Sequence, residues 1–430
     1  MLRLVPVAAI LIFQLISINV NAMAGTANAM VAPAAETGAG PLFRNGQWRA
    51  VLQRKDGNSI VFNFEVKDSV GKKILYIRNA GERLLVDDIT IQGDSVLIHL
   101  PFFESQLRAM LTKDGDLEGV WLKRGVDSYQ SVPFKATYRE SYRFPAQQPA
   151  AINVTGRWKA LFRTPDGKDS TLRVGEFEQK GQWVTGTFLD AGGDLRYLEG
   201  VVTGDSLKLS CFDGGHAYLF TAGIRGDSQL SGGQFFSGAS GYETWTADKD
   251  ADAKLPDEFS ITKWKKDAGP LDFTFRDIDG QPVSLGDARF KGKVLLIQIM
   301  GSWCPNCMDE TRFLSGFYNE YKSRGVEIIG LAYERSTDFA RSQGSLRSFK
   351  ERLGVKYPML ITGVSVGDPR RTEKTLPQLV QINNFPTTIF VDKKGFIELI
   401  HTGFSGPGTG AHYEEQKREF YQTVDRLLAE

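Results

Sequence analysis

Cysteine is scarce in this sequence, with only three among 430 residues: Cys211, Cys304 and Cys307. Three cysteines are too few to staple a secreted scaffold of this size, so if the protein is exported its cysteines serve chemistry. Charge of one sign is also lacking, because 52 Lys and Arg face 51 Asp and Glu and no long run of one sign occurs. The composition therefore gives no reason to expect nucleic acid or an anionic membrane surface as a partner.

Long apolar runs are confined to the N-terminus. Arg3 precedes an uncharged, mostly apolar run from Leu4 to Ile18, and small residues follow at Val20–Ala22. This layout is typical of a cleavable signal peptide, and the run is short for a membrane span. We predict a signal peptide over 1–22, a flexible leader over 23–40, and an exported, periplasmic protein without a membrane span after cleavage. An uncleaved signal would tether the protein instead.

The region after the leader consists of short alternating runs broken by glycine-containing turns, a pattern typical of β-strands. It also repeats: "GQWRAVLQRKDG" from Gly46 matches "GRWKALFRTPDG" from Gly156, an offset of 156 − 46 = 110 residues. We predict two copies of one β-rich domain, a small barrel or a sandwich, over 41–142 and 154–248. The polar segment 143–153 would link them.

The pattern changes in the last third of the chain, after a predicted linker over 249–268. "KVLLIQIM" from Lys293 and "VEIIGLAYE" from Val326 are continuous apolar runs, as expected for strands buried on both faces. A helical pattern follows each run, and a hairpin and an amphipathic helix close the chain. This order of elements predicts a thioredoxin-like α/β domain over 269–430.

The motif Cys304-Pro305-Asn306-Cys307 lies where the first of these strands ends and a helix begins. The free N–H groups and positive dipole end of a helix stabilise a thiolate, which favours Cys304 as the nucleophile. Cys307, one helical turn further on, would resolve the mixed disulfide. A purely structural staple is disfavoured, because the pair closes too small a loop to stabilise much. We therefore predict a redox pair.

A metal site at this motif would need further ligands, and the sequence offers none at ligand spacing. Cys211 aligns in the repeat with Leu100, an apolar strand position, which predicts a buried and inert thiol. The histidines are scattered along the chain at His99, His216, His401 and His412. No flavin or nicotinamide fingerprint occurs, so we expect neither a metal nor a cofactor.

The segment "WCPNC" followed by Glu310, with "NNFPTTIFVDKKG" from Asn383 downstream, resembles the TlpA/ResA family of thioredoxin-like proteins. The resemblance covers about residues 269–430. It implies an extracytoplasmic thiol–disulfide oxidoreductase, and reduction of protein disulfides is the favoured direction. The implied partners are a disulfide-bearing protein substrate and an extracytoplasmic electron-donor protein.

The resemblance also implies roles for individual residues. Pro386 falls at the family's cis-proline, where it would present the backbone of Phe385 to the active site and offer strand-like hydrogen bonds to a peptide. Glu310 would accept the proton of the second cysteine and return it. Trp303 would pack beside the disulfide and shield it.

Two positions depart from the family pattern. Thr311 stands where a proline is common, and the dipeptide between the cysteines is Pro305-Asn306 rather than the commoner x-Pro. Since this dipeptide helps to set the redox potential, the direction of electron flow stays open. Gln298 occupies the position of the buried aspartate of many thioredoxins and cannot titrate. The insert over 362–379 is either part of a substrate rim or a long loop.

Two further hypotheses compete with the reductase. A thiol peroxidase of the same fold would need a hydroxyl residue three positions before Cys304, and that residue is Gly301. In the other hypothesis the β repeats carry the function by binding a ligand or partner, and the redox domain serves them.

Overall fold

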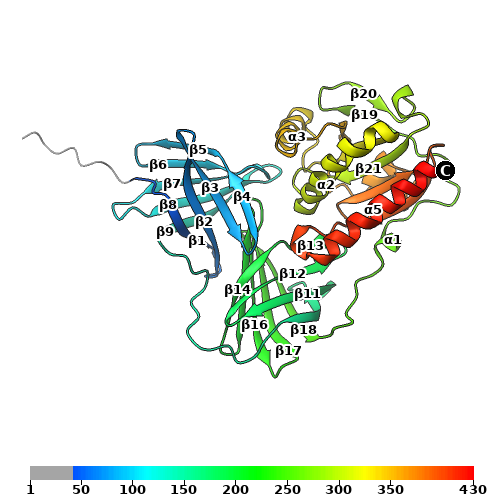
Figure 1. The fold of residues 1–430 in the computed structure, drawn as a ribbon. Helices are drawn as coiled ribbons and strands as arrows, with labels where there is room; N and C mark the ends of the chain where they lie inside the picture. The colour runs from blue at the N-terminus through cyan, green and yellow to red at the C-terminus, as the bar shows by residue number, and fades with distance from the viewer. Residues whose placement is uncertain (1–41) are drawn as a thin grey trace, which may run out of the picture. The chain divides into compact units, whose positions relative to one another are not determined.

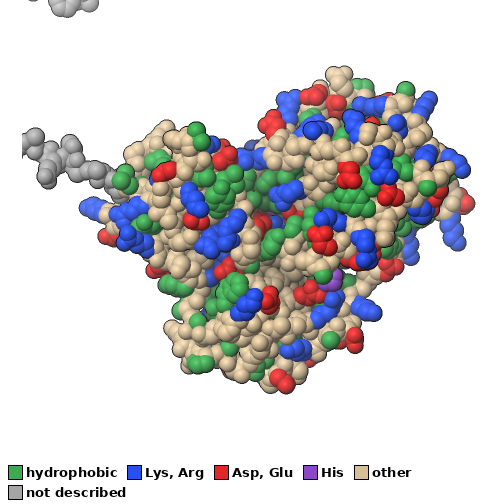
Figure 2. Space-filling view, viewed as in Figure 1, with side chains coloured by type: hydrophobic (Ala, Val, Ile, Leu, Met, Phe, Trp, Pro, Cys, Tyr) green, Lys and Arg blue, Asp and Glu red, His purple; other side chains and the backbone are tan. Residues whose placement is uncertain are grey.

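The computed structural model describes residues 42–430, so the predicted signal peptide and leader lie outside the described residues. Within this range the chain forms two sheets of nine antiparallel strands and one mixed sheet of seven (Figure 1). No described helix is long and apolar enough to cross a membrane. On the face in Figure 2, side chains of Lys and Arg are interspersed with those of Asp and Glu.

The first sheet has the strand order β4-β3-β2-β1-β9-β8-β7-β6-β5. Its strands are β1 (Gly46–Gln53), β2 (Ser59–Ser69), β3 (Lys72–Asn79), β4 (Glu82–Val86), β5 (Asp88–Gln92), β6 (Ser95–His99), β7 (Ser105–Leu111), β8 (Leu117–Arg124) and β9 (Tyr129–Tyr138). Alternate residues of β1, such as Trp48, Ala50 and Leu52, are buried, as the two-residue period of a strand requires. Trp48 donates from its indole nitrogen to the carbonyl of Arg44 at 3.1 Å.

The second sheet has the order β11-β10-β18-β17-β16-β15-β14-β12-β13, and an additional pairing of β11 with β12 closes it into a barrel. Its strands are β10 (Gly156–Arg163), β11 (Ser170–Lys180), β12 (Trp183–Asp190), β13 (Gly193–Asp194), β14 (Leu198–Thr203), β15 (Ser206–Phe212), β16 (Ala217–Arg225), β17 (Gln229–Ser237) and β18 (Gly241–Lys249). Trp158 repeats the bond of Trp48, donating to the carbonyl of Val154 at 2.9 Å. The prediction of two β-rich repeats is confirmed.

The segment predicted as a linker between the repeats is partly buried. Arg143 is 4% exposed and donates to the carbonyl of Ser210 at 3.1 Å. Phe144 packs into the core of the first sheet. The start of this segment therefore belongs to the packed structure.

The C-terminal region is a thioredoxin-like α/β domain, as predicted, with the sheet order β20-β19-β23-β22-β21-β24-β25. Its strands are β19 (Thr274–Asp277), β20 (Pro282–Ser284), β21 (Val294–Met300), β22 (Val326–Ala332), β23 (Met359–Ile361), β24 (Thr387–Val391) and β25 (Ile397–Thr402). Its α-helices are α2 (Pro305–Tyr321), α3 (Phe339–Leu353), α4 (Arg371–Thr375) and α5 (Ala411–Ala429), and the short α1 (Glu258–Ile261) precedes the sheet.

Both faces of the central strand β21 are covered, which explains why six of its seven residues are apolar. Leu296 packs in one core cluster with residues of α2, α3 and α5. Ile297, on the opposite face, packs in a second cluster with Leu376 and Leu379. These two leucines come from the insert over 362–379, so this part of the insert packs against the sheet. The carboxyl end of β21 is left to hold the cysteine motif.

Candidate active site

Cys304 and Cys307 form a disulfide at the start of α2, with their Cα atoms 5.2 Å apart. Cys304 is the N-cap residue, and its sulfur accepts from the backbone N–H of Cys307 at 3.1 Å. Pro305 occupies the first turn, where its missing N–H leaves no bond unmade. The helix N-terminus therefore stabilises negative charge on the Cys304 sulfur once the pair is reduced.

The residues predicted to support the pair lie around it. The Phe385–Pro386 peptide bond is cis, and the carbonyl oxygen of Phe385 lies 3.7 Å from the Cys304 sulfur. Trp303 donates from its indole nitrogen to the carbonyl of Tyr333 at 2.8 Å and contacts the Phe385 ring edge-on. A backbone carbonyl thus stands beside the reactive sulfur, at the place where strand-like recognition of a peptide would put its hydrogen bonds.

Glu310 lies one helical turn beyond Cys307 and is fully buried. Its carboxyl accepts from Gln298 Nε2 and from Thr388 Oγ1, both at 2.7 Å. Burial raises the pKa of Glu310 to about 7, against the smaller opposing effect of the two hydrogen bonds. Gln298 also approaches the carbonyl of Cys307 at 3.4 Å. A carboxyl that exchanges protons near neutral pH therefore stands close to the resolving cysteine.

A second buried carboxyl, which the sequence did not single out, stands beside the motif. Glu334 accepts from the backbone N–H of Ser302 at 2.8 Å and from its hydroxyl at 2.7 Å. Burial raises the pKa of Glu334, and the bonds from Ser302 oppose the rise. The pair of bonds fixes the backbone two residues before Cys304.

Asn306, between the two cysteines, reaches into the second β repeat. Its side-chain nitrogen donates to the carbonyl of Gly192 at 3.0 Å. Gly192 lies in the turn between β12 and β13, which the sequence analysis did not associate with the active site. This contact joins residues 114 positions apart, so no local pattern indicates it.

Arg196, just after this turn, is the centre of a buried ionic network. It is 1% exposed and pairs with Asp309 on α2, with Glu82 of the first repeat at 2.7 Å and with Asp213 at 3.6 Å. Burial raises the pKa of Asp194 to about 6; the charge of Arg196 opposes this and that of Asp309 adds to it. One guanidinium thus pairs with acidic residues from both repeats and from the cysteine-bearing helix.

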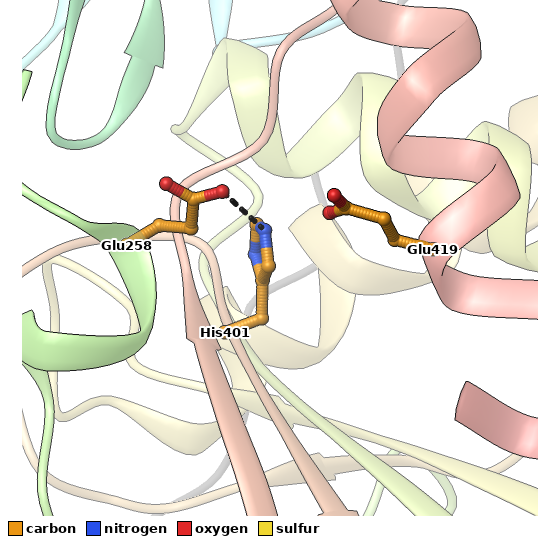
Figure 3. Close-up of side chains that lie close together, drawn as sticks. All are labelled: Glu258, His401 and Glu419. Carbon is orange, nitrogen blue, oxygen red and sulfur yellow. Dashed lines mark ion pairs between the residues drawn. The ribbon is translucent and has the colours of Figure 1, made fainter. Parts of the chain in front are cut away.

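Cys211 and His401 are two further titratable residues with buried side chains. Cys211 is fully buried in β15, and burial raises the pKa of its thiol. His401 is brought close to Glu258 and Glu419, which flank it from opposite sides in Figure 3, with ligand atoms within 4.8 Å of one another. Its Nε2 already lies 3.9 Å from the Glu258 carboxylate and 3.4 Å from Gln416. This trio is the group among the described residues that could hold a cation.

Comparison with known proteins supports the fold of the C-terminal region. Residues 267–400 match the AhpC/TSA family. This region has the thioredoxin-like fold described above. The match covers less than a third of the chain, so it bears on the thioredoxin-like domain and its cysteine motif.

Individual relatives match the same region. The thiol-disulfide oxidoreductase ResA of Geobacillus kaustophilus is 29% identical over 132 residues, 31% of this chain and 66% of the relative. ResA of Bacillus cereus is 31% identical over 123 residues, 29% of this chain and 61% of the relative. The chain thus spans less than two thirds of the length of these relatives. A solved thiol:disulfide interchange protein from Chlorobium tepidum is 21% identical, with 37% of this chain and 95% of that chain covered and a TM-score of 0.29.

Proposed function

We propose that this protein is an extracytoplasmic thiol–disulfide oxidoreductase that reduces protein disulfides through Cys304 and Cys307. The observation that carries the proposal is the position of the pair: Cys304 caps α2 beside the Phe385 carbonyl, and the buried Glu310 lies one turn beyond Cys307. The similarity of residues 267–400 to thioredoxin-fold proteins, including ResA, supports the same activity.

The reduced enzyme would act in two exchange steps. The Cys304 thiolate attacks one sulfur of the substrate disulfide, forming a mixed disulfide and releasing the other sulfur as a thiolate, which takes up a proton. Cys307 then gives its proton to the Glu310 carboxylate and attacks the Cys304 sulfur, releasing the second substrate thiolate. Glu310 returns the proton to that product. Two electrons pass to the substrate, and the enzyme is left with its Cys304–Cys307 disulfide.

The oxidised enzyme would then need a dithiol protein as electron donor, with which the same steps run in reverse. The location outside the cytoplasm rests on the signal-like pattern of residues 1–22, where Arg3 precedes the apolar run from Leu4 to Ile18. A disulfide-permissive compartment also fits a chain whose third cysteine, Cys211, is buried away from exchange.

The test is the reduction potential of the pair together with catalysis of insulin reduction by dithiothreitol. A potential near −270 mV would match a thioredoxin-like reductant, whereas one near about −120 mV would make the protein an oxidant. Insulin reduction should be accelerated by the wild type and not by Cys304→Ser. If the two thiols never form a mutual disulfide, the proposal fails. Peroxide consumption by the reduced protein would point to the peroxidase hypothesis instead.

A further inference from the structure

The nucleophilic cysteine is covered in this structure. Cys304 is only 3% exposed, although a partner protein must bring a sulfur atom into line with it. Residues Asp190–Asp194, which form the turn between β12 and β13 and its two flanks, lie against the neighbours of Cys304. We call these five residues the docked segment.

Within the docked segment, the backbone of Gly192 and Gly193 binds the thioredoxin-like domain. The carbonyl of Gly192 accepts from Asn306 Nδ2 at 3.0 Å and from the backbone N–H of Phe404 at 3.4 Å. Gly193 forms an isolated parallel bridge with Phe404. These are the strand-like bonds that an extended peptide would make beside the active-site disulfide.

Asp194 and the ionic network fix the far end of the segment. The Asp194 carboxylate accepts from the backbone N–H of Gly406 at 2.7 Å. Two residues later, Arg196 pairs with Asp309, which follows Cys307 by two positions on α2. The segment is therefore held by Asn306 inside the cysteine motif and by the backbone of Phe404 and Gly406 after β25.

Close approach requires glycine in this segment. A Cβ atom at Gly193, whose φ is +128°, would lie 2.2 Å from the carbonyl oxygen of Phe404 and 2.6 Å from Asn306 Nδ2. A Cβ atom at Gly192 would lie 3.6 Å from the carbonyl of Phe385, the atom beside the Cys304 sulfur. The second distance is an ordinary contact, so Gly193 is the position at which only glycine lets the backbone come this close to the thioredoxin-like domain.

We propose that the docked segment occupies the peptide-binding face beside Cys304, so that partner proteins exchange disulfides with this protein only after displacing it. This inference rests on the proposed function and names how that site is controlled. The partners that fit the vacated face are extended polypeptide segments near a disulfide. Such a segment offers one carbonyl to Asn306 and Phe404, with a residue lacking a bulky side chain next to it.

The test compares a protein reductant with a small one on the oxidised full chain. Gly193→Ala introduces the clashing Cβ and should release the segment. Gly226→Ala is the matched control, because Gly226 also has positive φ (+59°) in the second repeat but nothing lies within 4 Å of its Cβ position. Rate constants are measured for reduction of the Cys304–Cys307 disulfide by reduced thioredoxin and by dithiothreitol.

We expect Gly193→Ala to raise the ratio of the thioredoxin rate to the dithiothreitol rate at least tenfold, with the ratio unchanged in Gly226→Ala. An unchanged ratio in a folded Gly193→Ala protein would overturn the inference. Amide hydrogen exchange of the wild type provides a second measurement that needs no variant. Slow exchange at the N–H groups of Phe404 and Gly406 is expected, and exchange at the rate of free amides would overturn the inference. If dithiothreitol yields no reversible dithiol couple in any variant, the proposed function itself fails.

Discussion

Asn79–Glu82 of the first repeat and Asp190–Gly193 of the second are equivalent hairpin turns, related by an offset of 190 − 79 = 111 residues. In the first repeat the turn faces its sister domain: Asn79 donates to the carbonyl of Phe212 at 2.8 Å. In the second repeat the turn binds the cysteine-bearing domain through Gly192. Equivalent positions have therefore acquired different neighbours.

Strand pairing explains how the two turns differ. In the first repeat β3 pairs with β4 over five residue pairs, so the chain returns directly into the sheet. In the second repeat β12 pairs with β13 over two residue pairs and then with β14. Residues 191–192 and 195–197 are left outside the strands, and these residues contact α2 and the loop after β25. One copy of this turn thus contacts the sister repeat, and the other copy covers the disulfide.

The largest expected effect is on the rate of insulin reduction. It tests whether the thiol of the second repeat takes part in the exchange or whether this repeat only contacts the active site. Cys304→Ser should lower insulin reduction by more than about 1,000-fold, because the thiol that remains in the motif, Cys307, is fully buried and cannot reach a substrate disulfide. Cys211→Ala, in the second repeat, should leave the rate within about twofold, since a fully buried thiol with a raised pKa is not a nucleophile. Both rates are measured by insulin turbidity. A large loss in a folded Cys211→Ala protein would give the second repeat a chemical role.

Arg196→Leu gives the second repeat the residue that the first has at the equivalent position, Leu85, which is 43% exposed. Three carboxylates, those of the buried Asp213 and Asp309 and the half-buried Glu82, would lose their pairing with Arg196, so we expect a loss of about 3–5 kcal/mol in the free energy of unfolding. Urea unfolding followed by tryptophan fluorescence measures it. The matched control is Arg83→Leu in the first repeat, because the Arg83 side chain is exposed and forms no ion pair in the described structure. This substitution should change the free energy of unfolding by less than about 0.5 kcal/mol. If the free energy of unfolding fell by similar amounts in the two variants, Arg196 would contribute no more to stability than an exposed arginine does.

Glu310→Gln separates a proton role in the thioredoxin-like domain from one in the second repeat. We expect the rate of thiol–disulfide exchange to fall by about 10- to 100-fold above pH 7. The change of this rate with pH near pH 7 should also disappear. Asp194→Asn, whose carboxyl has a pKa near 6, should keep that dependence. If Asp194→Asn lost the pH dependence of the rate and Glu310→Gln kept it, the titrating group would lie in the second repeat.

The same substitution has a consequence for stability. The Glu310 carboxyl keeps its proton in the folded protein up to a pKa of about 7, whereas the unfolded chain releases it near 4.5. Wild-type stability should therefore fall as pH rises between these values, by about 3 kcal/mol in all. Glu310→Gln should lose this slope when urea unfolding is compared at pH 5 and pH 8.

The smallest effect concerns Glu176 of β11 and its first-repeat equivalent, Glu65. Glu176 accepts from His412 of α5 at 2.9 Å and raises the pKa of that histidine, whereas Glu65 pairs with Lys67 at 3.2 Å. The histidine contact should stabilise by less than about 1 kcal/mol below pH 6.5, and this contribution is lost as pH rises through the raised pKa. Glu176→Gln should remove that dependence in urea unfolding, and Glu65→Gln should not.

Sequence reasoning reached the architecture because its signals are local. The offset near 110 residues revealed the repeats, and the order of buried strands and helices predicted the thioredoxin-like domain. The positions of Cys304, Phe385 and Glu310 around one site follow from that fold. The hydrogen bonds from Gln298 and Thr388 to Glu310 could not be predicted without the packed structure, because the three residues come from separate elements.

The docked segment escaped prediction because its partners lie more than a hundred residues away. A signal was nevertheless readable in the repeat alignment. "NAGERLLV" from Asn79 matches "DAGGDLRY" from Asp190, with glycine in place of Glu82 and Arg196 in place of Leu85. The lost side chain at Gly193 and the new charge at Arg196 are two of the changes between the copies, and both residues contact the thioredoxin-like domain in the structure. Identifying the contacted surface needed the structure.

The bond from Asn306 to Gly192 has a thermodynamic consequence, because Asn306 stands inside the redox motif itself. Any difference in docking free energy between the disulfide and dithiol forms must appear, with equal size, as a shift in reduction potential. For a two-electron couple, 1.4 kcal/mol of such preference equals about 30 mV. A partner that binds the second repeat and pulls Gly192 away would then change the driving force for electron transfer without touching either sulfur atom.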